Sequence, residues 1–218
     1  MTSIVPKSKW GWMRLTVIVA VLVGVLAWLL FIPGVRYLCY APEEGDIVFQ
    51  SLPHMDLVDA IEGITGSPYS HCGVVVKDGD AWMVVESIGT VRKTPLFQWV
   101  RRGRGAGKFA AYRLKEEHRP NIPKFIAAIE PFMKRPYDFR YRMDDEYIYC
   151  SELVYKAWQN ATGGELGVLK KLGEMNWKPY EDTIRKYEEG DPPLEREMIT
   201  PRHLSEATQL EEVHSGGF

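Results

Sequence analysis

The feature that most constrains this chain is an uncharged apolar segment, residues 15–32, with the sequence LTVIVAVLVGVLAWLLFI. A helix of this length extends roughly 27 Å, which is close to the hydrocarbon thickness of a bilayer. Such a run is typical of a membrane-spanning helix. We therefore predict a transmembrane anchor over residues 15–32.

The charges that flank this segment predict its orientation. Lys7, Lys9 and Arg14 precede it, and only Arg36 follows closely. Basic residues stay on the cytoplasmic side, so residues 1–14 are predicted to be a cytoplasmic tail. The rest of the chain is then on the outer (periplasmic or extracellular) side of the cytoplasmic membrane. A cleaved signal peptide is the alternative, but its apolar region is usually shorter and ends in small residues, which favours an uncleaved anchor.

The composition of the remainder is that of an ordinary folded domain. The chain has 218 residues, enough for one well-packed domain with additions. Its net charge is -2, with acidic and basic residues mixed, so nothing indicates a nucleic-acid partner. Three cysteines, Cys39, Cys72 and Cys150, are too few for a disulfide framework, and no C-x-x-C pair indicates zinc. We predict neither a metal nor another cofactor.

Hydrophobic periodicity and turn residues divide the rest of the chain into elements. We predict a linker over residues 33–42, a domain over residues 43–208 and a flexible tail over residues 209–218. Within the domain, the pattern predicts strands over residues 47–49, 70–77, 81–87 and 109–114, and helices over residues 56–65, 122–133, 150–162 and from Thr200 onward. Mixed strands and helices, with a tight hairpin, favour an α+β fold with an antiparallel sheet packed against helices.

One hairpin brings two polar residues together. Asp78-Gly79 is the strongest short signal for a two-residue turn. If these two residues form the loop, Lys77 faces Asp80 and His71 lies directly opposite Glu86, on the same face of the sheet. The carboxylate would fix the imidazole tautomer and leave the other nitrogen free to act as a base. A single bulge would break this register.

Cys150 opens the predicted helix CSELVYKAWQNAT. It lies three and four positions before Leu153 and Val154 of the apolar stripe, so it shares their buried side. The start of a helix lowers the pKa of a thiol, because the dipole and the free N–H groups favour the thiolate. If the helix packs on the sheet face that carries His71, thiol and imidazole meet, with Glu86 as the orienting group.

Two neighbours of His71 receive other roles. Gly73 lies on the same face as His71 and would let the helix come close. Cys72 points to the opposite face. We expect it to be a core residue, packed among Val74, Val76, Met83 and Val85.

A non-catalytic interpretation of these residues stays open at this point. A buried cysteine at a helix start more often packs in the core than takes part in catalysis, and a histidine in a strand more often has a structural role than a catalytic one. The pairing of His71 with Glu86 favours catalysis, because an unpaired buried carboxylate is costly. From the residues alone, the two interpretations are about equally supported.

Four segments carry a family resemblance. They are Gly-Asp-Ile-Val-Phe-Gln at 45–50, Ser-His-Cys-Gly-Val-Val at 70–75, Val-Glu at 85–86 and Tyr-Cys-Ser-Glu-Leu-Val at 149–154. In this order they resemble the circularly permuted papain-like hydrolases of the YaeF/YiiX type, relatives of the NlpC-type cell-wall peptidases and of lecithin:retinol acyltransferase. The resemblance spans residues 43–207, and the cysteine helix follows the histidine strand, as in the permuted group.

The resemblance implies a permuted papain-like fold and acyl chemistry through a thioester. It maps the nucleophile to Cys150, the base to His71 and the orienting residue to Glu86, with Tyr149 as a weaker candidate for positioning the oxyanion. We expect a membrane-anchored cysteine hydrolase that cleaves an amide, such as one in cell-wall peptide. A lipid-directed thiol acyltransferase or lipase, and a non-catalytic tethered binding module, are the alternatives.

Three further segments do not define the function. The basic, glycine-rich residues 101–108 miss the phosphate-loop pattern and are predicted to be a solvated loop. The acidic residues 144–146 lack metal-loop spacing and are predicted to be a solvated turn. A charged insert over residues 165–193 is expected to form a lid or a contact surface.

Overall fold

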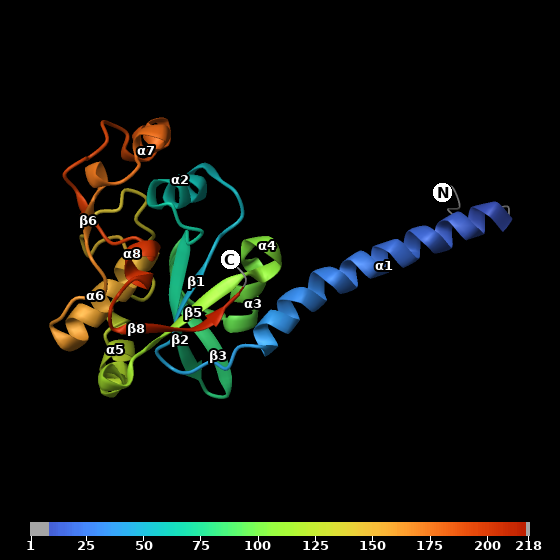
Figure 1. Cartoon of the computed structure of the whole chain (residues 1–218), viewed down its shortest axis with the longest axis horizontal. Helices are drawn as coiled ribbons and strands as arrows, with labels where there is room; N and C mark the ends of the chain where they lie inside the picture. Colours follow the sequence, from blue (N-terminus) through green and yellow to red (C-terminus); the bar gives the residue numbers. More distant parts are fainter. Residues whose placement is uncertain (1–8, 217–218) are drawn as a thin grey trace.

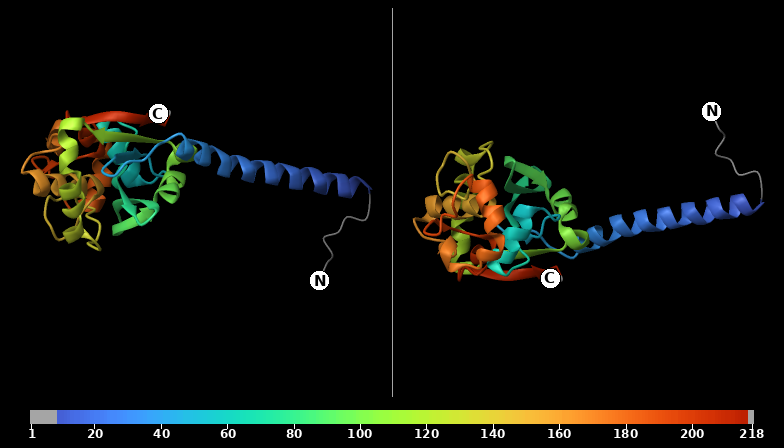
Figure 2. Two further views of the ribbon diagram at one scale, coloured as in Figure 1. Left: turned by 90° about the horizontal axis from the view of Figure 1, so that it is seen from below. Right: turned by 90° about the horizontal axis from the view of Figure 1, so that it is seen from above.

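A computed structural model describes residues 9–216, apart from the side chains of residues 9, 26, 28–33 and 106. Helix α1 (Lys9–Leu38) projects from the rest of the chain as a long rod (Figure 1 and Figure 2). The predicted linker is therefore wrong for residues 33–38, which continue the helix. Residues 1–8 of the predicted cytoplasmic tail lie outside the described residues.

The prediction of a transmembrane helix over residues 15–32 is not confirmed. Within the described part of the chain, no helix combines the length and the apolar character needed to cross a membrane. The side chains of residues 26 and 28–32, which belong to the predicted span, lie outside that description.

A six-stranded sheet forms the centre of the described domain, in the order β4-β3-β2-β1-β5-β8, and all its neighbouring strands are antiparallel. Its strands are β1 (Ile47–Gln50), β2 (His71–Asp78), β3 (Ala81–Ile88), β4 (Thr90–Pro95), β5 (Phe109–Leu114) and β8 (Leu210–Ser215). A separate pair is formed by β6 (Lys170–Lys171) and β7 (Glu197–Met198). The predicted α+β class with an antiparallel sheet is confirmed.

The helices lie on both sides of the sheet and at its ends (Figure 1). They are α2 (Asp56–Thr65), α3 (Leu96–Arg102), α4 (Arg104–Gly107), α5 (Ile122–Ala127), α6 (Cys150–Thr162), α7 (Glu181–Glu188) and α8 (Pro201–Ser205). Short 3₁₀ turns occupy Glu116–Asn121, Glu130–Phe132, Leu172–Glu174 and Lys178–Tyr180.

The alternation along the strands divides the core into two layers. Val74 of β2 points to one face and packs in a cluster with Leu153 of α6 and Phe125 of α5. Val75 points to the other face and packs with Trp99 of α3. Because successive strand residues face opposite sides, each residue of β2 is assigned to one of these two layers.

The predicted helix over residues 122–133 is divided in two. Helix α5 ends at Ala127, and a 3₁₀ turn, Glu130–Phe132, follows. Pro131 explains the break, because it has no N–H to donate to the carbonyl of Ala127 and its ring disfavours a continuous helix. The predicted apolar face nevertheless holds, since Phe125 and Phe132 are both buried.

Several elements differ from prediction. Strand β4 and helices α3 and α4 were not expected, and the last two replace most of the solvated loop predicted at 101–108. The flexible tail is wrong for residues 210–215, because they form β8, which pairs with β5 at the sheet edge. The insert at 165–193 folds into β6, two 3₁₀ turns and α7.

Candidate active site

The hairpin that carries His71 has a register shifted by two residues from the predicted one. Asp78 pairs with Ala81, so the two loop residues are Gly79 and Asp80. Gly79 has a positive φ of 59°, as the first loop residue of a type II′ turn requires. By this register, Gly73 and not His71 lies opposite Glu86. A shift of two keeps every side chain on its predicted face, because the pleat has period two.

His71 and Glu86 therefore meet diagonally. Nε2 of His71 lies 2.6 Å from Oε2 of Glu86, and both side chains are buried, with exposed fractions of 2% and 0%. The predicted pairing of these two residues is confirmed. Since Nε2 is held by the carboxylate, Nδ1 is the imidazole nitrogen left for another partner.

Gly73 has a different role from the predicted one. A Cβ there would lie 2.5 Å from Cγ1 of Val84 and 2.7 Å from the carbonyl oxygen of Val85. Both atoms belong to β3, so glycine lets the two strands of the hairpin approach closely, and the close approach is to β3 and not to α6.

Two residues that the sequence did not indicate hold Glu86 in place. Thr94 of β4 donates its hydroxyl to Oε1 at 2.6 Å, and Nη1 of Arg102 donates to the same oxygen at 3.0 Å. Nη2 of Arg102 pairs with Oε2. Burial raises the pKa of Glu86, but hydrogen bonds and charge from His71 and Arg102 outweigh it and hold the carboxylate well below its usual pKa.

Cys150 begins α6 in the interior of the domain. It is 1% exposed, and Leu153 and Val154 are fully buried, as the helical spacing predicted. Glu152, also buried, accepts the backbone N–H of Tyr149 at 3.2 Å and pairs with Nζ of Lys156 at 2.9 Å. Glu152, the third residue of α6, therefore stabilises the start of its own helix.

Three further hydrogen bonds attach the segment around Cys150 to distant parts of the chain. The hydroxyl of Ser87 in β3 donates to the carbonyl of Ile148 at 2.5 Å. Ser151 donates its hydroxyl to the carbonyl of Ile199 at 2.9 Å, and the hydroxyl of Tyr149 accepts the N–H of Ile199 at 3.1 Å. The side chain of Tyr149, a weak oxyanion candidate, is thus engaged with Ile199 in this structure.

The thiol of Cys150 interacts with His71 and with Cys72. Hydrogen bonding with Cys72 and then with His71 lowers the pKa of Cys150 well below its usual value, although burial opposes this. For His71, burial also opposes the charged form, but hydrogen bonding with Cys150 and Glu86 raises the pKa to about 9. These opposite shifts favour a thiolate–imidazolium pair.

The sheet face that α6 covers is not the predicted one. Cys150 and Leu153 belong to the apolar cluster that contains Cys72 and Val74, whereas the ring of His71 lies on the other layer, 6.2 Å from the ring of Trp99. Because His71 is the first residue of β2, its imidazole can reach the thiol at the end of the strand. Cys72 is a core residue, as predicted, but it also shares a buried cluster with Cys150.

A cavity of about 210 Å³ opens beside His71 at this end of the sheet. Its walls are almost entirely apolar and include Leu52, Leu57, Val58, Ile61, Tyr137 and Phe139. The hydroxyl of Tyr137 lies 3.0 Å from that of Tyr141. Burial, more than any other influence, raises the pKa of both tyrosines well above the usual value, and the charge of Cys150 adds to it.

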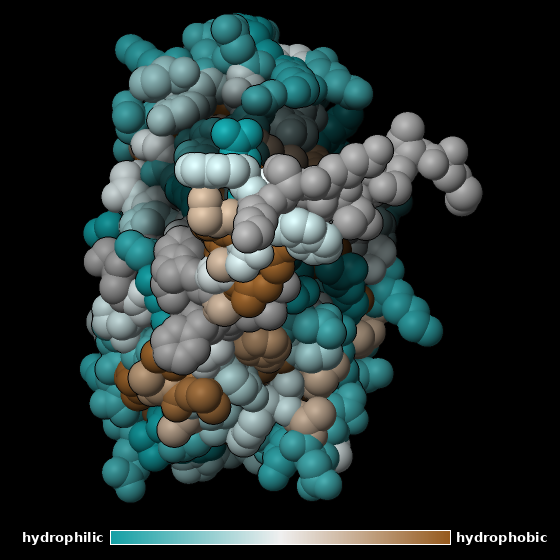
Figure 3. Space-filling view, turned by 90° about the vertical axis from the view of Figure 1, so that its right-hand side faces the viewer, coloured by the Kyte–Doolittle hydropathy of each residue, from teal (hydrophilic) through white to brown (hydrophobic). Residues whose placement is uncertain are grey.

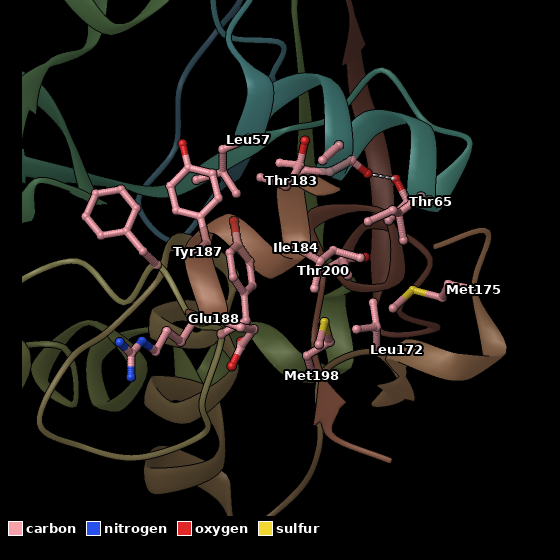
Figure 4. Close-up of a pocket in the computed structure, with 16 residues that line it drawn as sticks. Leu57, Thr65, Leu172, Met175, Thr183, Ile184, Tyr187, Glu188, Met198 and Thr200 are labelled. Atoms are coloured by element: carbon pink, nitrogen blue, oxygen red, sulfur yellow. Dashed lines mark hydrogen bonds between the residues drawn. The ribbon is translucent and has the colours of Figure 1, made fainter. Parts of the chain in front are cut away.

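A second apolar cavity, of about 80 Å³, lies between α2 and the insert. Leu57 from α2 and Ile184 and Tyr187 from α7 face one another across it, and Met198 closes it from below (Figure 4). The two cavities share three lining residues, Leu57, Ile61 and Phe139. The two cavities therefore adjoin, and we call their apolar lining, from His71 to the insert, the apolar tract.

The basic and acidic segments are structural in part. Arg102 from the predicted solvated loop binds Glu86, and Arg104 forms an ion pair with Glu62 of α2. Asp144 caps a turn by accepting the N–H of Glu146 at 3.0 Å, which agrees with the predicted turn.

The fold and the site together define a class of protein. A helix that begins with a buried cysteine, packed at the end of an antiparallel sheet that supplies a histidine and its carboxylate partner, is the arrangement of papain-like cysteine hydrolases. Residues 41–214 match the family model of the permuted papain-like amidase enzymes, YaeF/YiiX, family C92. The chain belongs to this family, and the predicted resemblance is confirmed.

Two relatives support the assignment. The chain is 33% identical over 181 residues to the uncharacterized protein YiiX of Escherichia coli strain K12, a match that covers 80% of this chain and 87% of that protein. It is also similar to the crystal structure described as metalloprotein YiiX from Escherichia coli O157:H7, with a TM-score of 0.75 and 32% identity. That match covers 81% of this chain and 98% of the other.

The word metalloprotein applies to that E. coli structure. Among the described residues of this chain, no group of three or more His, Cys, Asp or Glu side chains is arranged to hold a metal ion.

Proposed function

We propose that this chain is a cysteine amidase or peptidase that cleaves an amide bond through a thioester on Cys150. The observation that carries the proposal is the 2.6 Å contact between Nε2 of His71 and Glu86, which leaves Nδ1 for the thiol. A base oriented in this way, beside a thiol at a helix start, is an activated nucleophile.

The first half-reaction forms the acyl-enzyme. The Cys150 thiolate attacks the carbonyl carbon of the amide, and a carbon–sulfur bond forms while the carbonyl oxygen becomes an oxyanion. His71, which holds the proton taken from the thiol, donates it to the leaving nitrogen as the carbon–nitrogen bond breaks. In the second half-reaction His71 takes a proton from water, and the resulting hydroxide releases the acid and restores the thiolate.

Donors for the oxyanion come from the start of α6 and from the cavity. The first N–H groups of a helix have no intrahelical partner, so the backbone N–H of Cys150 is available to the developing charge. Tyr137 lines the cavity beside His71, so its hydroxyl, 3.0 Å from that of Tyr141, is the second donor that we propose. We assign Tyr137 this role ahead of Tyr149, whose hydroxyl is bonded to Ile199.

We further propose that the enzyme works at the outer surface of the cytoplasmic membrane, on an amide such as one in cell-wall peptide. The uncharged residues 15–32 and the basic residues before them support this placement. Apolar side chains on α1 are also exposed, including Val17, Leu22 and Val23 at 58%, 62% and 60%. In Figure 3, which looks at the face from which α1 projects, hydrophobic residues gather centrally and hydrophilic ones border them.

The test is covalent trapping on the full chain in detergent micelles. Iodoacetamide at neutral pH is expected to alkylate Cys150, identified by peptide mapping, faster than exposed Cys39. Cell-wall peptide fragments should then leave an acyl adduct on Cys150 in the intact mass. If Cys150 stays unmodified at neutral pH, the activated thiolate is wrong. A Cys150→Ala variant equal to wild type in every assay would favour the non-catalytic binding module.

A lipid-directed acyltransferase or lipase is the second candidate, and the apolar tract from His71 to the insert favours it. Its walls offer few polar partners for a peptide but suit a hydrocarbon chain. Incubation of the same protein with phospholipid vesicles separates the candidates, because a fatty-acyl mass on Cys150 identifies the lipid-directed reaction and a peptidyl mass identifies the amidase.

A further inference from the structure

Cys72 is a second buried thiol at the site, and the reaction as described above does not use it. It follows His71 in β2, lies opposite Phe49 of β1 and is fully buried. It belongs to the same apolar cluster as Cys150 and Val74.

Cys150 lies beside the start of β2, which explains how the consecutive residues His71 and Cys72 can both interact with its sulfur. Cys72 faces the layer that α6 covers, so its side chain points toward the helix start from below. His71 faces the other layer but begins the strand, so its ring approaches from the strand end. Helix α6 packs against β2, and hydrogen bonding with Cys72 and then with His71 lowers the pKa of Cys150 despite its burial, so both residues act on the one sulfur.

A buried thiolate needs such donors. Cys150 is 1% exposed, so water does not solvate its charge, and an unsolvated charge is costly. The imidazolium of His71 supplies one donor, and an S–H group is a second, weaker one. Burial, and then hydrogen bonding with Cys150, raise the pKa of Cys72 well above its usual value, so Cys72 keeps its proton.

We propose that Cys72 is a positioning residue whose S–H group donates a hydrogen bond to the Cys150 thiolate and holds the sulfur in its ion pair with His71. The inference rests on the proposed thiol chemistry and extends it. The competing explanation is that Cys72 fills space in the core, as a small apolar residue would.

The test compares Cys72→Ala, which removes the donor, with Cys72→Ser, which keeps one. The rate of Cys150 alkylation by iodoacetamide is measured from pH 4 to pH 10 on the full chain, with peptide mapping. We expect Cys72→Ser to follow wild type, and Cys72→Ala to need a higher pH, reacting about tenfold more slowly on the acid limb. Val76→Ala, a truncation on the same strand face, should lower stability and leave the pH profile in place.

Coincidence of the Cys72→Ala profile with wild type, or an equal shift in both Cys72 variants, would overturn the proposal. A wild-type Cys150 that fails to react at neutral pH instead contradicts the proposed function, so the two failures differ. If the Cys72 variants do not fold, Raman spectroscopy of the S–H stretch tests the hydrogen bond from Cys72 to Cys150 instead. We expect the Cys72 band to lie at lower frequency in wild type than in Cys150→Ala, and equal frequencies contradict the hydrogen bond.

Discussion

On one side of His71, charged and hydrogen-bonding groups are packed at fixed distances, and on the other side lies an apolar cavity. The first side consists of Glu86, Thr94 and Arg102, whose contacts converge on a single carboxylate. The second consists of side chains from α2 and the loop around Phe139, with few polar atoms. The two sides meet at the imidazole ring.

The difference implies that one side of His71 determines the proposed chemistry and the other side determines which substrate binds. A buried polar network is stable only when each of its groups has a hydrogen-bond partner. The contacts of Glu86 therefore specify one orientation of the imidazole ring of His71. An apolar cavity distinguishes its ligands mainly by size and shape, so the other side leaves the acyl group less defined. Changes on the first side should alter rate, pH dependence and stability, whereas changes on the second should alter substrate affinity.

The largest effect is expected from removing the nucleophile. Cys150→Ala should lower turnover by at least about 10³-fold for any amide or ester substrate, because Cys72, the neighbouring thiol, keeps its proton and does not replace the thiolate. Steady-state kinetics with the substrate found by trapping provide the measurement. Cys39→Ala, which alters an exposed cysteine far from His71 in the sequence, is the matched control and should retain wild-type turnover.

The next effect concerns Glu86. Glu86→Gln keeps the shape but removes the charge that supports the imidazolium, so kcat/KM should fall about 10²- to 10⁴-fold. With wild type, kcat/KM should decline above pH 9 as His71 loses its proton, since its pKa is about 9. Losing the carboxylate lowers that pKa, so the alkaline limb should move to lower pH.

The pH–rate profiles of wild type and of Glu86→Gln check this prediction. Glu117→Gln, on the exposed 3₁₀ turn after β5, should leave the profile unchanged. Superimposable alkaline limbs for wild type and Glu86→Gln would falsify the assignment of Glu86 as the orienting residue.

A smaller effect is expected on stability from Arg102. Arg102→Met leaves the buried carboxylate of Glu86 without its closest guanidinium partner and with only the more distant Arg92, which should lower the free energy of unfolding by about 3 kcal/mol. Urea unfolding followed by tryptophan fluorescence measures the change. Arg101→Met alters an exposed neighbour and should change stability by less than about 0.5 kcal/mol. Equal stability of the two variants would show that the Glu86 ion pair adds nothing.

The smallest effect should come from the cavity. Ile61→Ala enlarges the tract where its two cavities join, and should raise KM about tenfold for a long acyl substrate while kcat changes little. Ile64→Ala, which lines only the cavity remote from His71, is the matched variant. A fall in kcat with unchanged KM for Ile61→Ala would show that this side of His71 also shapes the transition state.

The sequence predicted the triad partly because of a property of strands. The hairpin register was wrong by two residues, yet His71 and Glu86 still meet, because an even shift preserves the face. A shift of one residue would have separated them. The buried side of α6 was also predictable, since Cys150, Leu153 and Val154 follow helical spacing.

Other features could not be predicted from local pattern. The periodicity of α6 shows which side of the helix is buried, but not which face of the sheet it covers, so the role of Cys72 was missed. Arg102 lies in a basic, glycine-rich stretch typical of loops, and only the tertiary fold brings it to Glu86. Strand β8 alternates weakly because Glu211 and Glu212 are both exposed at the sheet edge.

The contacts of Ser151 and Tyr149 with Ile199 set an order of assembly for the enzyme. His71 and Glu86 leave the ribosome first, and the nucleophile follows in α6, but the supports of its helix start come almost fifty residues later still. A nascent chain that ends before Ile199 carries the whole triad without the anchor points that fix the thiol. The permuted order of segments thus places the supports of the proposed nucleophile after it in the chain, and a fragment cut before Ile199 should carry an unactivated cysteine.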